Sequence, residues 1–345
     1  MRTFLKPDTS NLKPNYNHRN TLPKFITSNL QLITFRKGTP ITMKNNQFFG
    51  FLILLSAAFI WGTSFIAQAG AAQVIEAFTF NTVRSPMGAI ILIPVIMWMD
   101  KKAGRPIGFF DSPDPEERKT LLKAGIISGF FMNAGIFFQT IGLYTTTIAK
   151  SGFLTALYVI LVPILGAIFC KTIVRKVEWL AAFISCIGMY FICINEGFSI
   201  DMGDVYTILC AFGYAGQVLT IGIYAGRVDG MRMSFIQLIA SSVMSFIGMV
   251  LFESPSWSAI QSVMWELVYA GVLSSGIAYT LQIVGQAYVS APTAVITLCL
   301  ESVFALLSGI VWLHQIPTLR ELGGCALVFI AVLMAQIPTI MQGRK

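Results

Sequence analysis

Ten apolar stretches, separated by short polar links, make up most of the chain. A helix needs roughly 20 apolar residues to cross a bilayer core about 30 Å thick. The sequence therefore predicts an all-α integral membrane protein with ten transmembrane helices. The predicted spans are residues 48–67, 77–99, 121–142, 147–169, 178–195, 204–225, 233–252, 264–286, 292–313 and 319–338.

The spans are arranged as two copies of a five-span unit. Gln139-Thr-Ile-Gly142 recurs 143 residues later as Gln282-Ile-Val-Gly285, and the same offset places Tyr158 on Glu301. A unit with an odd number of crossings enters the membrane upside down relative to its copy. Such inverted repeats are a recurring basis of secondary transporters, whose substrate site lies near the midplane where the repeats meet.

The predicted domains follow from this repeat. Residues 47–196 form the first five-helix repeat, and residues 203–340 form the second, inverted one. Residues 1–46 form a basic N-terminal tail that we expect to be disordered. The run Met43-Lys-Asn-Asn46 directly before the first span resembles a natural start. An over-called start with Met43 as the true start, a disordered cytosolic tail and a targeting presequence all remain open.

Composition excludes several classes of protein. The chain is 55% hydrophobic and 12% charged, with a mean hydropathy of +0.71, which excludes a soluble globular protein. The net charge of +8 alone would fit a nucleic-acid partner, but many of the basic residues lie in the short links between spans, so no nucleic-acid partner is expected. The six cysteines lie in or at the ends of spans without CxxC spacing. The sequence predicts no metal site and no cofactor.

The basic residues also predict an orientation. An excess of lysine and arginine in short loops marks the cytoplasmic side. The 100–120 link and the link around Arg175 are rich in these residues, whereas their counterparts at 253–262 and 314–318 contain none. Inversion requires this asymmetry, because the counterparts face outward. We expect both termini in the cytoplasm, with the chain in the cell (plasma or inner) membrane.

Four motifs resemble those of the EamA-like group of the drug/metabolite transporter superfamily. They are Ala58-Phe-Ile-Trp-Gly-Thr-Ser-Phe65, Phe80-Asn-Thr-Val-Arg84, Leu157-Tyr-Val-Ile-Leu-Val-Pro163 and Leu300-Glu-Ser-Val-Phe-Ala305. The resemblance covers residues 48–338. It implies a ten-helix inverted-repeat carrier that moves small metabolites, such as amino acids or their derivatives, often outward. The chain departs from the family at Ser302, where proline is common, and at His314-Gln315, where an acid is frequent.

Two ionisable residues inside spans are the main candidates for binding substrate. A charge within a span is costly, so each needs a reason. Glu301 is predicted to bind a substrate amine or to carry a coupling proton, and its alternative is a hydrogen-bonded helix contact. Arg84, with Asn81 three residues earlier on the same helical face, is predicted to hold a carboxylate or phosphate. Its alternatives are snorkelling to the outer headgroups and a structural pair with Glu301.

Aromatic and amide side chains complete the predicted cavity. Small-metabolite pockets combine aromatic walls with a few placed polar groups. Each aromatic residue also has a packing role as its alternative, and each amide has an interhelical hydrogen bond. The remaining candidates are Trp61, Tyr158, Tyr214, Gln139, Gln217, Gln237 and Gln282.

The favoured function is a secondary active transporter, in the export direction, that works by alternating access. Its partners are a small-molecule metabolite and the lipid bilayer, with proton coupling through Glu301 left open, as is the oligomeric state. A lipid or lipid-linked-sugar flippase of the same fold is the alternative. An intramembrane enzyme is disfavoured, and no catalytic residue is predicted, because His18 and His314 are the only histidines and no HExxH or GxSxG occurs.

Overall fold

The structure is a computed structural model that describes residues 47–110, 114–146, 148–194, 201–314 and 316–342. The predicted tail at 1–46 lies outside the described residues. The described chain is helical, without a named strand, and ten of its helices are long and apolar enough to cross a membrane. The all-α, ten-span prediction is confirmed.

The helices follow the predicted spans closely. The first five spans are α2 (Gln47–Ala72), α3 (Ala77–Lys102), α4 (Pro115–Gly142), α5 (Ile148–Ala156) with α6 (Tyr158–Phe169), and α7 (Lys176–Cys193). The other five are α8 (Met202–Tyr224), α9 (Gly230–Phe252), α11 (Met264–Tyr269) with the π-helix η3 (Ala270–Ala278) and α12 (Tyr279–Gln286), α13 (Ala291–Leu298) with α14 (Leu300–Leu313), and α15 (Leu319–Gln342). The short helix α10 (Trp257–Ser262) lies between α9 and α11.

The third span differs most from its prediction, because α4 begins at Pro115 rather than near residue 121. Asp114 caps the helix by accepting a hydrogen bond from the Glu116 N–H at 3.0 Å, and Pro115 favours the first turn. The helix therefore starts in polar sequence. Hydropathy alone detects only its apolar part.

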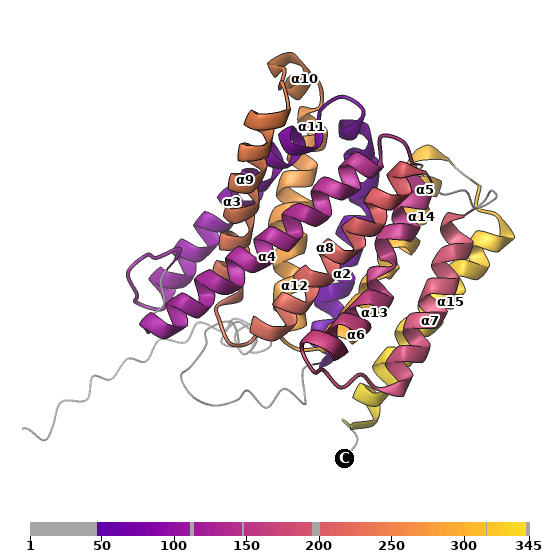
Figure 1. Ribbon diagram of the computed structural model, residues 1–345. Helices are drawn as coiled ribbons and strands as arrows, with labels where there is room; N and C mark the ends of the chain where they lie inside the picture. The colour runs from indigo at the N-terminus through magenta and orange to yellow at the C-terminus, as the bar shows by residue number, and fades with distance from the viewer. Residues whose placement is uncertain (1–46, 111–113, 147, 195–200, 315, 343–345) are drawn as a thin grey trace, which may run out of the picture. The chain divides into compact units, whose positions relative to one another are not determined.

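The contacts between spans are nearly unchanged when the two halves are exchanged. The third span, α4, packs on α8 and α9, and its equivalent, the span containing η3, packs on α2 and α3. Equivalent spans also pair with each other: α7 lies along α15, and α3 lies along α9 (Figure 1). This pattern is what two halves related by a pseudo-two-fold axis produce. The opposite threading of the halves stays a prediction.

Carboxylates join α3 to α9 at both ends. Glu253, after α9, accepts hydrogen bonds from the backbone N–H groups of Phe78 (2.7 Å) and Thr79 (2.6 Å) at the start of α3. Asp100, near the end of α3, pairs with Arg232 near the start of α9 at 2.5 Å. Asp100 and Glu253 are 153 residues apart, as are Thr79 and Arg232, and the same offset relates Trp61 to Tyr214 in the first spans of the two repeats. The two joints therefore occupy equivalent positions in the repeats and hold α3 and α9 together.

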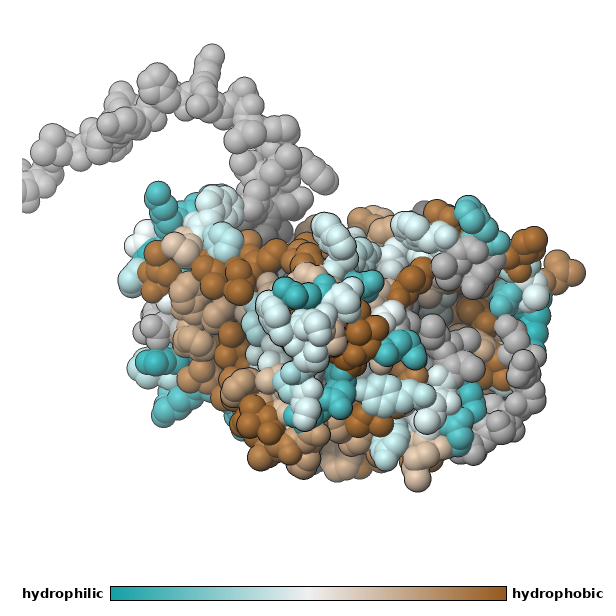
Figure 2. Space-filling model, turned by 90° about the horizontal axis from the view of Figure 1, so that it is seen from above, coloured by the Kyte–Doolittle hydropathy of each residue, from teal (hydrophilic) through white to brown (hydrophobic). Residues whose placement is uncertain are grey.

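Large apolar side chains lie on the outer faces of the spans. Phe130 is 54% exposed, Phe246 52% and Trp312 63%. Figure 2 shows hydrophobic residues gathered on the surface beside hydrophilic ones. Exposed apolar area on this scale suits a lipid environment, because a protein surrounded by water rarely exposes large contiguous apolar patches.

Candidate functional site

Three spans are interrupted near their middle. Leu157 separates α5 from α6, and Cys299 separates α13 from α14. The two breaks lie one residue from exact repeat equivalence, since Leu157 aligns with Leu300. The third interruption is the π-helix η3, a geometry that is rare and frequent at functional sites. Broken helices near the midplane are also where secondary transporters commonly bind substrates.

A small cavity lies where these interruptions meet. The space in which the centre of a water molecule fits measures about 50 Å³, so the cavity holds a few water molecules or part of a small solute. Its walls come from both halves of the chain. The lining residues are Trp61, Ser64, Gln68, Arg84, Gln139, Thr155, Tyr158, Tyr214, Gln217, Val218, Ser274, Tyr279, Gln282, Leu298 and Glu301.

The structure brings together eight of the ten predicted site residues around this cavity. Asn81 and Gln237 do not line it. The Asn81 amide donates to Asn133 at 2.7 Å and lies among the hydroxyls between α3 and α9, while Gln237 accepts a 2.5 Å hydrogen bond from Ser128. Both make the interhelical contacts that were the alternative for buried amides. Asn81 lies one helical turn from Arg84, but the Asn81 side chain contacts Asn133 of α4 and not the cavity.

Arg84 is buried in the wall of the cavity, with 1% of its surface exposed. Its guanidinium donates to Ser275 Oγ at 2.8 Å, to Ser274 Oγ at 3.1 Å and to Gln68 Oε1 at 3.3 Å. The Phe80 ring lies 5.1 Å from its central carbon. Snorkelling to the headgroups is therefore ruled out. Among the described residues no carboxylate forms an ion pair with Arg84, so neutral groups hold its charge.

Glu301 lies in the first turn of α14, two residues after the break at Cys299, and its side chain lines the cavity. Within the described part of the chain its carboxylate makes neither a hydrogen bond nor an ion pair. The structural pair of Arg84 with Glu301 is thus not formed. The backbone at Glu301 packs closely on α2, because a Cβ on Gly62 would lie 2.6 Å from the Glu301 carbonyl oxygen.

An amide network connects the two halves across the cavity. Gln139 accepts from Gln68 Nε2 at 3.0 Å and from the Tyr214 hydroxyl at 3.2 Å, and it donates to Thr155 Oγ1 at 3.1 Å. Its repeat equivalent Gln282 accepts from Gln217 Nε2 at 3.2 Å. The network fixes the orientation of these side chains around the space at the centre.

Aromatic side chains close the remaining walls. Trp61 donates its indole N–H to the Ser274 carbonyl at 3.2 Å, and its ring meets the Tyr279 ring edge-on at 5.0 Å. The π-helix contributes to this contact, because Ser274 lies within it. Tyr214 lies over Gly135, where a Cβ would come within 2.8 Å of the ring.

Sequence reasoning missed seven lining residues, some of which carried a usable signal. Ser64 and Gln68 follow Trp61 at helical spacing on one face of the first span, and Tyr279 precedes Gln282 by three residues. The Ser274 hydroxyl was not detectable, because the π-helix shifts the face on which it lies. Thr155, Val218 and Leu298 carried no distinguishing signal.

The cavity therefore presents a cation and a carboxylate that do not neutralise each other. Such a site can accept the negative end of a solute at Arg84 and its positive end, or a proton, at Glu301. Among the described residues no group of three or more histidine, cysteine, aspartate or glutamate side chains could hold a metal ion.

Comparisons with known proteins agree with this architecture. An uncharacterized transporter of Archaeoglobus fulgidus is 28% identical over 284 residues, which cover 82% of this chain and 84% of that protein. The uncharacterized transporter YoaV of Bacillus subtilis is 22% identical over 287 residues, covering 81% of this chain and 94% of its own length. One crystal structure superposes with a TM-score of 0.68 at 19% identity, over 84% of this chain and 98% of that one, which supports the fold alone.

The family comparison covers most of the chain. The sequence model of the EamA-like transporter family matches residues 48–194 and 201–336. The two matched segments contain nearly all of the described spans and both helix breaks. This multi-pass membrane protein therefore belongs to the EamA-like transporter family.

Proposed function

We propose that the protein is a secondary active transporter that exports small metabolites carrying both a negative and a positive group, such as amino acids or their derivatives. The repeats 47–196 and 203–340 lie in opposite orientations in the cell membrane, with both termini in the cytoplasm. The central cavity binds the solute, and the two repeats expose it to each side in turn.

The carrying observation is that a buried arginine and an ionisable carboxyl group line one cavity without pairing with each other. Burial of an ion without a countercharge costs several kcal/mol, roughly, even after local relaxation. Arg84 has only neutral hydrogen-bond partners, and the described residues give Glu301 no polar partner at all. A bound solute with a carboxylate and an ammonium group supplies both missing charges. The small cavity volume limits the part of the solute that it encloses.

Glu301 also offers a route for energy coupling. A carboxylate in this position takes up a proton when no amine is bound, so substrate and proton compete for the same group. Competition of this kind links substrate release to proton binding. A gradient of protons, of the substrate itself or of an exchanged solute then drives transport.

A groove on the surface favours a second candidate, a flippase for lipids or lipid-linked sugars. Trp265 is 83% exposed and Trp312 63% exposed in this groove between α2, α11 and α14. The groove combines an apolar wall with the carboxylate of Glu266, which suits a lipid tail and the ammonium group of a phospholipid headgroup. Thr63 lines the groove and the adjacent Ser64 lines the central cavity, so the two lie on neighbouring faces of α2.

The test compares metabolites in cells lacking and overproducing the protein, and then measures counterflow of the altered compounds in proteoliposomes. We expect counterflow of compounds that carry both charges and weaker counterflow of analogues that lack either one. Glu301→Gln should reduce counterflow by about tenfold, the loss expected for one charge-assisted hydrogen bond, and should remove its pH dependence. Glu116→Gln, an exposed carboxylate at the start of α4, is the matched control.

Two results would contradict the proposal. Unchanged pH-dependent transport in Glu301→Gln would remove the proton role from Glu301. Movement of a labelled phospholipid between leaflets, without counterflow of any small compound, would favour the flippase.

A further inference from the structure

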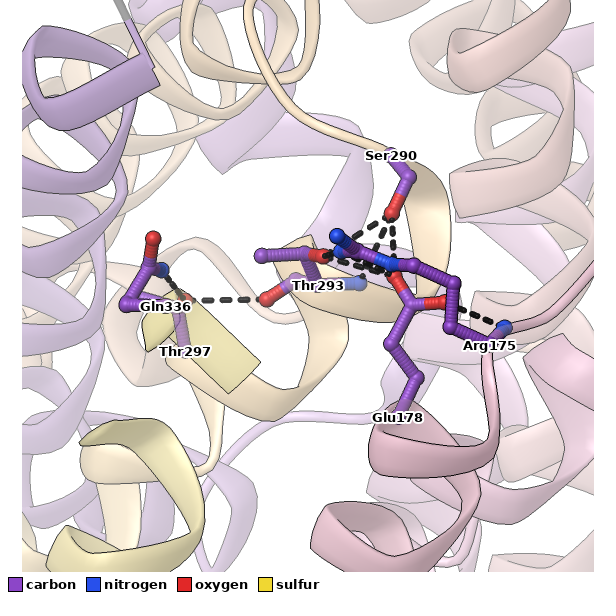
Figure 3. A network of polar contacts seen from close by, with 6 residues as sticks. All are labelled: Arg175, Glu178, Ser290, Thr293, Thr297 and Gln336. Carbon is purple, nitrogen blue, oxygen red and sulfur yellow. Dashed lines mark hydrogen bonds and ion pairs between the residues drawn. The ribbon is translucent and has the colours of Figure 1, made fainter. Parts of the chain in front are cut away.

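A carboxylate network outside the cavity connects the start of α7 to the start of α13. Glu178 is 1% exposed, and its Oε1 accepts hydrogen bonds from Ser290 Oγ at 2.8 Å and Thr293 Oγ1 at 2.9 Å. Arg175 donates to the same oxygen at 2.9 Å, and its backbone N–H donates to Oε2 at 2.8 Å. Figure 3 shows the Glu178 carboxylate between Arg175 and the two hydroxyls.

The helix held by Glu178 extends from this network to the cavity. All residues of α13 from Pro292 to Leu298 are buried, and Leu298 lines the cavity. Thr297 accepts a further hydrogen bond from Gln336 of α15 at 3.4 Å (Figure 3). The break at Cys299 and then Glu301 follow directly. This two-turn helix therefore fills the path between the cavity and the membrane side on which Arg175 lies, the cytoplasmic side in the predicted orientation.

The helices α13 and α5 are the parts of two broken spans that precede the break, and we call each a half-helix. The half-helix of the first repeat, α5, is held in the same way as α13. Lys150 of α5 is the repeat equivalent of Thr293, at the offset of 143 residues. It forms an ion pair with Asp204, which is 1% exposed near the start of α8 and also accepts a hydrogen bond from Thr146. At its other end α5 reaches the cavity with Thr155. A buried carboxylate thus holds each half-helix at the end that lies away from the cavity.

The two carboxylates also have the same local setting. Each accepts a hydrogen bond from the backbone N–H three residues earlier, Glu178 from Arg175 at 2.8 Å and Asp204 from Asp201 at 2.9 Å. Each carboxylate is thereby fixed to the first turn of its own helix. Each carboxylate also accepts from a side chain of a half-helix in another span, Glu178 from Thr293 of α13 and Asp204 from Lys150 of α5.

We propose that α5 and α13 are the two gates of the transport path, and that Asp204 and Glu178 are positioning residues that keep them closed. The proposal rests on the proposed transport cycle. The small cavity between two buried half-helices is an occluded state, and release of one carboxylate network opens one side. The continuous helices α3 and α9 do not separate in this cycle, because Glu253 and Asp100 join them at both ends.

Two native cysteines report on the two gates. Cys299 is 2% exposed at the inner end of α13, and Cys210 is fully buried with its sulfur 3.7 Å from Thr155 Oγ1 at the end of α5. The experiment applies a membrane-impermeant maleimide to one face of proteoliposomes containing the full chain. Peptide mass spectrometry then quantifies the label on each cysteine separately, in both protein orientations.

Glu178→Gln should raise labelling of Cys299 by about tenfold, the difference between a charged and a neutral acceptor, from the side that holds Arg175. Labelling of Cys210 should stay unchanged. Asp204→Asn should produce the reverse pattern from the opposite side. Thr293→Val removes a donor from α13 without touching Glu178 and should repeat the Glu178→Gln result, even where Glu178→Gln fails to fold. Glu116→Gln is the control with an exposed carboxylate.

The outcomes separate the gates from the transport function. Equal changes at both cysteines, a change from the wrong side, or no change in Glu178→Gln and Thr293→Val would overturn the gates. Counterflow by the wild-type protein in the same vesicles tests transport independently. Side-specific labelling without counterflow would reject transport and keep the moving half-helices, whereas counterflow with unchanged labelling would reject the gates alone.

Discussion

The two charges in the cavity lie on helices of opposite character. Arg84 belongs to α3, a continuous helix that carboxylates join to α9 at both ends, and its guanidinium has three hydrogen-bond acceptors. Glu301 follows a helix break and has no polar side-chain partner among the described residues. One charge is therefore fixed in place before a ligand arrives, and the other is left adjustable. A fixed cation orients a solute, while an adjustable carboxylate changes its partner as the site changes sides.

The contrast between a fixed Arg84 and an adjustable Glu301 predicts its largest effect at the Asp100–Arg232 joint, which holds α3 against α9. Asp100→Asn removes the charge that Arg232 contacts at 2.5 Å and Arg105 at 3.1 Å. Arg232 keeps its ion pair with Asp229 at 2.6 Å, so the variant weakens two charge-assisted hydrogen bonds to Asp100 without leaving Arg232 unpaired. We expect a loss of about 3 kcal/mol in stability, read as a lower apparent Tm in detergent.

Glu253→Gln at the other joint is the comparison for that variant. Its two carboxylate oxygens accept separately from the backbone N–H of Phe78 and from the N–H and hydroxyl of Thr79. A glutamine keeps one acceptor oxygen, which still serves Thr79, and loses the bond from Phe78. We expect a smaller loss, about 1 kcal/mol. An equal loss in both variants would show that the charge of Asp100 does not contribute to holding α3.

The second largest effect should come from the fixed cation itself. Arg84→Lys keeps the charge and loses the planar group that contacts Ser274, Ser275 and Gln68 together. We expect counterflow of compounds with both charges to fall by about 30-fold, because a point charge cannot satisfy all three acceptors and a carboxylate. Arg227→Lys, at an exposed position between α8 and α9, is the matched control.

Arg84→Lys also separates orientation from charge. A variant that transports as well as the wild type would show that the charge of Arg84 suffices and that the preformed contacts on η3 do not orient the solute. A loss of stability equal to the loss of transport would assign Arg84 to packing.

Much of this arrangement follows from simple sequence patterns. Hydropathy gives the ten spans because each helix must match the thickness of the bilayer. The repeat offset, which pairs Tyr158 with Glu301, places residues from both halves at one cavity before any coordinates are known. The cost of a charge in a span singles out Arg84 and Glu301, and the structure places both at the cavity.

The remaining features depend on tertiary structure. A π-helix over 270–278 has no signature in hydropathy, so the Ser274 and Ser275 contacts of Arg84 were not predicted. The fourth span is interrupted at Leu157, a residue that carries no helix-breaking signal in the sequence. Glu178 and Asp204 were missed because they lie in the first turns of spans, where a carboxylate usually needs no partner from another helix.

The smallest effect concerns the continuous helices that support the cavity wall. A Cβ on Gly135 of α4 would lie 2.8 Å from the Tyr214 ring, so Gly135→Ala must displace the ring and weaken its 3.2 Å hydrogen bond to Gln139. We expect a loss of about 1 kcal/mol in stability and a threefold to tenfold loss of counterflow, roughly, from overpacking at this site. Gly323→Ala is the matched control on α15, where no atom lies within 4 Å of the added carbon. It should leave counterflow unchanged and gain a few tenths of a kcal/mol, roughly, from helix propensity. If Gly135→Ala behaves like Gly323→Ala, then α4 and α8 move apart at little cost in free energy. In that case only α3, which carries Arg84, is a rigid part of the cavity wall.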